Sequence, residues 1–131
     1  MQVSTVNTLL PDSKKAGILT ISKSTLSDAH LRAANVPSDT PIGTTEDGAE
    51  FSRVILNDEL QLNIELARMD NINAALKMKT DYPELGAIIL ECTNMSPYAE
   101  AIQEAIELPV FSIVNFVEWL HAGLKPKRFS S

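Results

Sequence analysis

The only cysteine of the chain, Cys92, lies where an apolar segment gives way to polar residues. The preceding run, Leu85 to Leu90, is continuously apolar, which is typical of a strand covered on both faces. Ser96 and Pro97 then predict the start of a helix, as N-cap and first helical residue. Ligands of open parallel sheets bind at the carboxyl ends of the strands, and free N–H groups at a helix start stabilise a nearby anion. A thiolate at Cys92 would serve as base or nucleophile. The alternative is a buried structural cysteine that behaves as a small hydrophobe.

A second polar group follows the first long apolar run of the chain, Ala16 to Ile21, which predicts another strand. Its hydroxyl-bearing members are Ser22, Ser24 and Thr25. Ser27 comes next, before a segment from Asp28 to Ala34 that is typical of a helix with a hydroxyl cap. These hydroxyls could bind a ligand at the strand end, or they could serve only as caps.

Three further ionisable side chains have two readings each. Glu91 precedes the cysteine, and strand alternation directs it away from Cys92. It could orient a neighbouring donor and raise the basicity of the thiol, or it could reach solvent at the sheet edge. His30 and His121 fall within predicted helices, where a surface or packing role is favoured over chemistry. We therefore expect no metal site.

Strands and helices alternate along the remaining chain. Pro41 predicts a short edge strand between Thr40 and Thr45, because proline cannot donate to a central ladder. A short helix is expected where Phe51, Val54 and Ile55 recur at helical spacing. A longer one should run from an Asn63 cap to about Lys79, with an inner face made of Leu66, Met69, Ile72 or Asn73, and Leu76.

The last third continues the same alternation. A helix after the cysteine should turn inward Tyr98, Ile102, Ala105 and Ile106. A short strand is then expected from Pro109 to Val114, followed by a helix that Asn115 caps and Gly123 ends. The residues before the first strand, which end at Pro11-Asp-Ser-Lys-Lys15, are interpreted as a polar lead-in. The alternation predicts a three-layer α/β domain with a parallel sheet of about four strands and helices on both faces.

Composition limits the class of partner. A net charge of −6 and 5% aromatic residues argue against nucleic acid. No stretch reaches the length of a membrane span, so we expect a soluble protein. One cysteine cannot form an internal disulfide, and a reactive thiol suits a reducing compartment, which predicts the cytoplasm.

The 131 residues fit one domain, and its final helix is unusual. Apolar residues lie on more than one face of that helix, whereas the outer helix of a small domain needs a single stripe. The residues concerned are Phe116, Val117, Trp119 and Leu120. Residues 115–131 are therefore a candidate docking helix and tail, for a homodimer or a partner half-domain. The alternative is a wide face buried within this domain.

With these residues laid out, four segments of the chain resemble the aspartate/glutamate racemase superfamily. They are Leu90-Glu-Cys-Thr-Asn-Met95, Pro97-Tyr98-Ala99, Glu107-Leu-Pro-Val-Phe111 and Ala16-Gly-Ile-Leu-Thr20. The superfamily also includes hydantoin racemases, maleate isomerases and arylmalonate decarboxylases. The resemblance runs from about Lys15 to Gly123, and it implies a flavodoxin-like domain that is normally half of a two-domain enzyme without metal or pyridoxal cofactor.

The resemblance also implies a chemistry. In such enzymes one thiolate removes the proton alpha to a carboxylate, and a thiol on the opposite face returns one. Cys92 matches the cysteine of the second half, and Thr93 and Asn94 match positions that hold the substrate carboxylate. The hydroxyl segment after the first strand, Ser22, Ser24 and Thr25, matches a substrate loop more loosely. The substrate class implied is a small carboxylate or amino acid.

The chain departs from the family because it has no second cysteine and resembles only the C-terminal half. Inversion with two bases needs groups on both faces of a planar intermediate, so a second half-site is expected to complete the domain. One-thiol chemistry is an alternative: decarboxylation followed by protonation, or cis-trans isomerisation of a diacid. A catalytically inactive binding or structural module is the other alternative.

Overall fold

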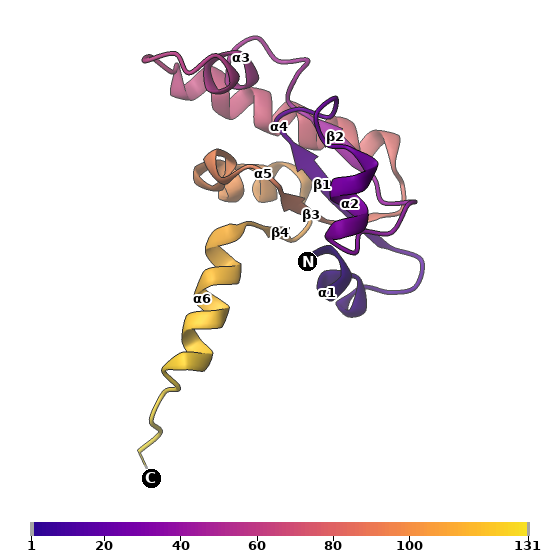
Figure 1. Cartoon of the computed structure of the whole chain (residues 1–131), viewed down its shortest axis with the longest axis vertical. Coiled ribbons are helices and arrows are strands. Elements are labelled where there is room, and N and C mark those ends of the chain that lie inside the picture. The colour runs from indigo at the N-terminus through magenta and orange to yellow at the C-terminus, as the bar shows by residue number, and fades with distance from the viewer. Residues whose placement is uncertain (1, 131) are drawn as a thin grey trace.

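The computed structural model describes residues 2–130 and shows a single parallel sheet with helices on both faces (Figure 1). The strand order is β2-β1-β3-β4, which is the beginning of the flavodoxin-like order. The strands are β1 (Lys15–Thr20), β2 (Ile42–Thr44), β3 (Leu85–Leu90) and β4 (Val110–Phe111). The predicted three-layer α/β class and its four strands are therefore confirmed.

Seven helical segments accompany the sheet in the described part of the chain. They are α1 (Gln2–Leu9), α2 (Asp28–Ala33), α3 (Phe51–Leu56), α4 (Ile64–Asp81), the 3₁₀ helix η1 (Thr93–Tyr98), α5 (Ala99–Ile106) and α6 (Ile113–Leu124). The predicted caps of α2 and α4 are confirmed, because the Ser27 and Asn63 side chains accept hydrogen bonds from backbone N–H groups in the first turns. Within residues 2–130, none of these helices combines the length and apolar character that crossing a bilayer requires.

The two central strands carry both cores of the domain. In the register of β1 with β3, Ile18 lies opposite Ile89 and Leu19 opposite Leu90. Alternate side chains of a strand face opposite sides of the sheet, so Leu19 and Leu90 enter one core while Ile18 and Ile89 enter the other. Burial on both faces explains why these strands are continuously apolar.

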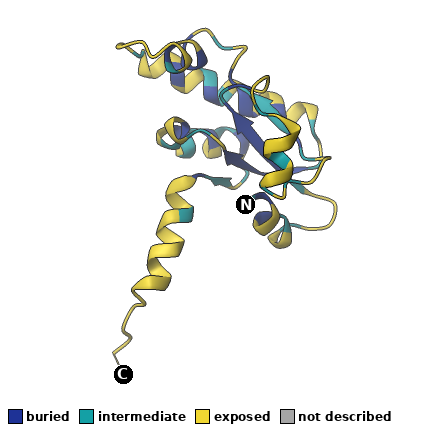
Figure 2. Ribbon diagram, viewed as in Figure 1, coloured by how far each residue is buried: buried dark blue, intermediate teal, exposed yellow. Residues whose placement is uncertain are grey.

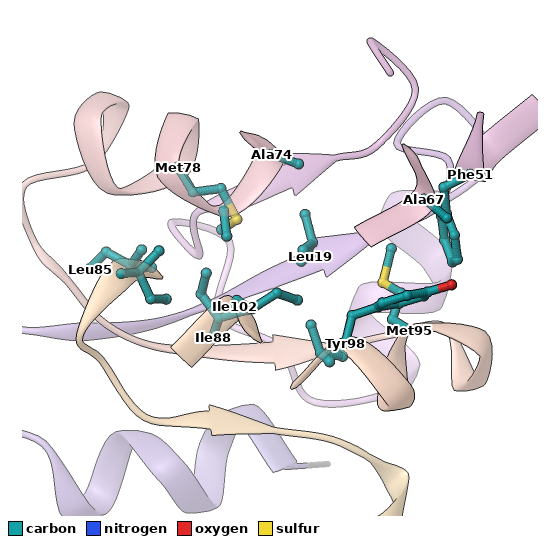
Figure 3. Packing of buried hydrophobic residues seen from close by; sticks show 13 residues of the cluster. Leu19, Phe51, Ala67, Ala74, Met78, Leu85, Ile88, Met95, Tyr98 and Ile102 are labelled. Atoms are coloured by element: carbon teal, nitrogen blue, oxygen red, sulfur yellow. The ribbon is translucent and has the colours of Figure 1, made fainter. Parts of the chain in front are cut away.

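The larger core lies between the sheet and α3, α4, η1 and α5 (Figure 3). Phe51 and Tyr98 meet there edge to face, with ring centroids 5.8 Å apart. α4 contributes small side chains and one long one: Ala67, Ala74, Ala75 and Met78. Met78 lies so close to β2 that a Cβ atom on Gly43 would come within 2.3 Å of its Cγ. α4 therefore approaches the sheet through its small residues.

That close approach reverses the predicted inner face of α4. Leu66, Met69 and Leu76 are 51%, 48% and 40% exposed, and Asn73 is exposed as well, so the prediction that they form the core was wrong. Only Ile72 of that set is half-buried. If Leu66, Met69 and Leu76 faced the sheet, their larger side chains would hold α4 farther from it than the alanine side chains do.

The smaller core lies on the opposite face, under α1 and α2. Val3 and Val6 of α1 pack there against the strands, and the Asn7 Oδ1 atom accepts a hydrogen bond from the Ala16 backbone N–H at 2.8 Å. The interpretation of the residues before β1 as a polar lead-in was therefore wrong for Gln2–Leu9, which forms a helix that covers this face of the sheet. Residue 1 lies outside the described residues.

α6 leaves the body of the domain, and none of its described residues is buried (Figure 2). Ser112 is its N-cap, and Asn115, which we predicted as the cap, instead accepts a hydrogen bond from the Ser112 N–H and completes a capping box. Gly123 lies within the helix and does not end it. Near this start, the Gln2 Nε2 atom donates to the Ser112 carbonyl at 3.1 Å, which connects α1 to the base of α6.

Candidate functional site

Cys92 lies at the carboxyl end of β3, as predicted, and is half-exposed. Its side chain packs against the larger core, and its carbonyl oxygen accepts a hydrogen bond from the Met95 N–H at 3.0 Å. Cys92 is the N-cap residue of η1, although its side chain accepts no capping hydrogen bond. The sulfur therefore stands at a strand end, between the core and the surface.

The helix start predicted at Ser96 and Pro97 was wrong. Both residues lie inside η1, and α5 begins only at Ala99. Ser96 caps nothing, because its Oγ atom is buried without a hydrogen-bond partner among residues 2–130. The backbone donors nearest to Cys92 thus belong to a single short 3₁₀ segment, whose dipole is smaller than that of a long α-helix.

Thr93 and Asn94 form the exposed first residues of η1. The first N–H groups of a helix have no partner within the helix. Among the described residues, neither the Thr93 N–H nor the Asn94 N–H donates a hydrogen bond. Two adjacent backbone donors beside Cys92 are therefore open to an anionic group from solution.

Glu91 connects the ends of the two central strands. Its Oε2 atom accepts a hydrogen bond from the buried Thr20 hydroxyl at 2.9 Å, and its N–H donates to the Leu19 carbonyl at 2.9 Å. Glu91 is otherwise exposed, so it both orients a neighbouring donor and reaches solvent. Glu91 also lines a groove on the face of α1 and α2, whereas Cys92 packs on the face of α4 and α5. Alternation along β3 thus separates the carboxylate from the thiol, as predicted.

The hydroxyls after β1 are held by a carboxylate that sequence reasoning missed, Glu46. Its Oε1 accepts from the Ser22 hydroxyl at 2.8 Å and from the Ser24 hydroxyl at 3.1 Å. Its Oε2 accepts from the Lys23 N–H at 2.9 Å and from the Thr44 hydroxyl at 3.0 Å. The donated hydrogen bonds, above all that from Ser22, lower the pKa of Glu46 below its usual range, despite an opposing effect of burial.

Thr25, the third predicted hydroxyl, donates to the Ser22 carbonyl at 3.2 Å. All three hydroxyls are therefore engaged within the domain. A ligand carboxylate would have to displace Glu46 to reach Ser22 or Ser24. Glu46 could have been anticipated, because β2 is parallel to β1 and the residues after both strands meet at one edge of the sheet.

These contacts form one polar network along the carboxyl edge of the sheet. The Ser22 N–H donates to the Thr20 hydroxyl oxygen at 3.3 Å, and Thr20 and Ser22 in turn donate to Glu91 and Glu46. Among the described residues, the Cys92 side chain makes no hydrogen bond to this network and is connected to it only as the sequence neighbour of Glu91. The structure thus joins the predicted hydroxyl loop to Glu91, while Cys92, Thr93 and Asn94 form a separate group at the same edge.

A groove of about 290 Å³ adjoins the network on the face of α1 and α2. Its walls are mainly apolar and include Ile18, Leu26, Leu31, Val36, Ile89 and Phe116, and we call it the α2 groove. Glu91, Thr93 and His30 also line it, whereas Cys92 does not. The His30 Nδ1 atom accepts a hydrogen bond from the Ser27 N–H at 3.4 Å, so this histidine completes the cap of α2.

Neither histidine joins Cys92 in a cluster, and His121 is exposed on α6. Among the residues that the structure describes, no three histidine, cysteine or carboxylate side chains gather as ligands for a metal ion.

Comparison with known proteins gives one partial similarity. No protein-family model matches the chain. No solved structure matches it significantly. A segment of 41 residues is 38% identical to Dimethylsulfoniopropionate lyase 5 of Emiliania huxleyi (strain CCMP1516). That segment is 31% of this chain and 8% of the relative, so the chain spans only a small part of the relative's length.

Proposed function

We propose that the chain is a cofactor-independent, racemase-like isomerase domain that moves the proton alpha to a carboxylate. The observation that supports this most directly is the placement of Cys92 at the carboxyl end of a central strand, beside the unpaired N–H groups of Thr93 and Asn94. A sulfur and two backbone donors within three consecutive residues can serve the two parts of one small acid, its Cα–H and its carboxylate.

The chemistry assigns a role to each group. The thiolate of Cys92 accepts the alpha proton, and the electron pair moves into the carboxylate, which becomes an enediolate. The N–H groups of Thr93 and Asn94 donate to the oxygens on which this charge develops, and they need no reorganisation to do so. Ser22 and Ser24 stabilise the neighbouring loop through Glu46, and Thr25 does so through the Ser22 carbonyl. Ser22 and Ser24 reach the substrate only if the Glu46 carboxylate moves aside.

The chain supplies a base for one face of the intermediate. Return of the proton to the opposite face requires a second half-site, because the chain contains one cysteine. The chain by itself should therefore exchange the alpha proton with solvent without inverting the centre. This is the behaviour that distinguishes a half-site from a complete two-base racemase.

Exchange in D₂O tests the proposal. Candidate acids such as aspartate, glutamate and methylmalonate are incubated with the wild-type chain and followed by proton NMR for loss of the alpha signal. Cys92→Ser should abolish exchange, while Thr80→Ser, which changes an exposed residue on the far end of α4, should leave it intact. Equal exchange with wild type and Cys92→Ser would overturn the role of the thiol, and no exchange with any acid would favour the inactive binding module.

The partial similarity to a lyase favours one second candidate, elimination from a small carboxylate. That relative is named for dimethylsulfoniopropionate, which also carries an alpha proton next to a carboxylate. The Cys92 thiolate would remove this proton, the bond between the beta carbon and the sulfonium sulfur would break, and dimethyl sulfide and acrylate would result. The Cys92 thiol would then release the proton to solvent. Headspace chromatography of the chain with this substrate tests the alternative. Release of dimethyl sulfide by the wild type but not by Cys92→Ser would favour elimination over isomerisation.

A further inference from the structure

The described part of α6 presents an apolar surface that its own domain does not cover. Val117 and Trp119 are 54% and 69% exposed, and Leu124 is 85% exposed. A helix that is apolar around more than half of its circumference is normally buried, and an isolated helix of this length is only marginally stable in water. A partner surface should therefore cover α6.

The same domain leaves an apolar groove open. The α2 groove is lined by aliphatic side chains of α2, of the loop before it and of the sheet, among them Leu31, Leu26 and Ile89. Ile113 and Phe116 in the first turn of α6 also line it. The helix continues without interruption to Leu124. It runs away from the sheet and the other helices (Figure 1). Within a single copy the first turn of α6 borders the groove, but the apolar residues beyond Phe116 cannot enter it unless the helix breaks.

From this self-complementarity we propose that the chain forms a twofold dimer in which α6 of each copy packs into the α2 groove of the other. In a closed twofold pair each contact between helix and groove occurs twice, and neither apolar surface stays exposed. Phe116 lines the groove of its own copy. The α6 helix of the partner copy would therefore lie beside the first turn of the α6 helix that belongs to the groove's own copy.

Charge favours a second copy of this chain as the occupant. Lys125, Lys127 and Arg128 follow α6 and carry +3 of a chain whose net charge is −6, so the remaining residues carry −9. A basic tail that follows α6 would meet an acidic domain, in which Glu91 is one of the residues that line the groove. Opposite charges of this kind set orientation and accelerate association.

The mass in solution tests the proposal. Sedimentation at micromolar concentration should give twice the 14.3 kDa of one chain. The double variant Val117→Asp, Trp119→Asp should sediment as a monomer with an unchanged circular dichroism signal from the sheet domain, because no residue of α6 is buried. Leu60→Asp, at a fully exposed position outside α6, is the matched control and should remain dimeric.

A disulfide test then locates the contact. In a Cys92→Ser background, chains that carry Trp119→Cys are mixed with tagged chains that carry Leu31→Cys and are oxidised. Cross-links should join the two kinds of chain. A monomeric wild type would overturn the dimer, and cross-links found only between two Trp119→Cys chains would overturn the assignment to the groove. If Met69→Asp were monomeric while the Val117→Asp, Trp119→Asp variant stayed dimeric, the proposal would be wrong and the interface would lie on the exposed face of α4.

Discussion

Glu46 offers the sharpest test of how the carboxyl edge of the sheet is held together. Replacement by alanine removes the acceptor of four hydrogen bonds, from Ser22, Ser24, Thr44 and the Lys23 N–H. Ser22 is only 3% exposed, so water cannot easily replace the lost acceptor there. A buried donor left without its partner costs about 1–3 kcal/mol.

Two features place the expected loss toward the lower end of that range. The Ser22 and Ser24 hydroxyl oxygens are 3.0 Å apart, so Ser22 retains a neighbouring partner in the variant. Ser24 is exposed, and Thr44 is half-buried, so their hydroxyls can turn to water at little cost. We therefore expect Glu46→Ala to lower the free energy of unfolding by about 1–2 kcal/mol, measured by urea denaturation at neutral pH.

The same substitution carries a pH signature. Because the pKa of Glu46 is lowered on folding, mainly by the Ser22 hydroxyl, its contribution is complete above the unfolded pKa and is lost as pH falls through the folded pKa. The stability difference between wild type and Glu46→Ala should therefore shrink as the pH is lowered from neutral to below about 4.5, the ordinary pKa of a glutamate.

Glu104→Ala is the matched control, since Glu104 is an exposed carboxylate for which the described residues provide no hydrogen-bond partner. It should change stability by less than about 0.5 kcal/mol at either pH. Equal losses in the two variants, or a loss at Glu46 that does not depend on pH, would refute the reasoning that this carboxylate organises the loop after β1.

Other substitutions test the fold. Gly43→Ala should cost about 1–3 kcal/mol in urea denaturation, because its Cβ would meet Met78, whereas Gly123→Ala, which meets no atom within 4 Å, should cost nothing measurable. Leu66→Gln should change the free energy of unfolding by less than about 0.5 kcal/mol, since that side chain faces solvent, and a loss of several kcal/mol would restore it to the core. Ser27→Ala should cost about 1 kcal/mol through loss of the α2 cap, and an unchanged thermal midpoint would count against that cap.

The strand pattern of the sequence was enough to predict the sheet, because its physical cause lies within the strands themselves. Leu85 to Leu90 is buried on both faces, and only a continuous apolar run satisfies that condition. Pro41 in turn identified the strand beside it as an edge. Caps at Ser27 and Asn63 were predictable because capping is local chemistry.

The inner face of α4 was not predictable from hydrophobicity. Leu66 and Leu76 are more apolar than Ala67 and Ala75, yet the alanines face the sheet. What decides the orientation is the distance between helix and sheet, and that distance is fixed by Gly43 on another element. The residue pattern of α4 alone cannot predict its inner face, because this constraint comes from another element.

The candidate site likewise has one part that the sequence predicted and one part that it did not. Cys92, Thr93 and Asn94 are adjacent in sequence, so their common place at the end of β3 followed directly from the strand prediction. Glu46 lies 24 residues from Ser22, and its contacts depend on how the loops after β1 and β2 fold over one another. The dimer interface of α6 stays a prediction from its exposed apolar residues, as does the proton-transfer role of Cys92.

The bond from Gln2 to the carbonyl of Ser112 has a consequence for handling the protein. It closes a span of 110 residues, so the amino-terminal helix and the root of the last helix are anchored to one another. Packing of α1 against the sheet already brings the two segments together, so this hydrogen bond has little chain entropy of its own to overcome. An affinity tag fused ahead of Gln2 would lie close to Ser112 and could interfere sterically with the first turn of α6. Deletion of α1 would remove contacts both to Ser112 and to β1.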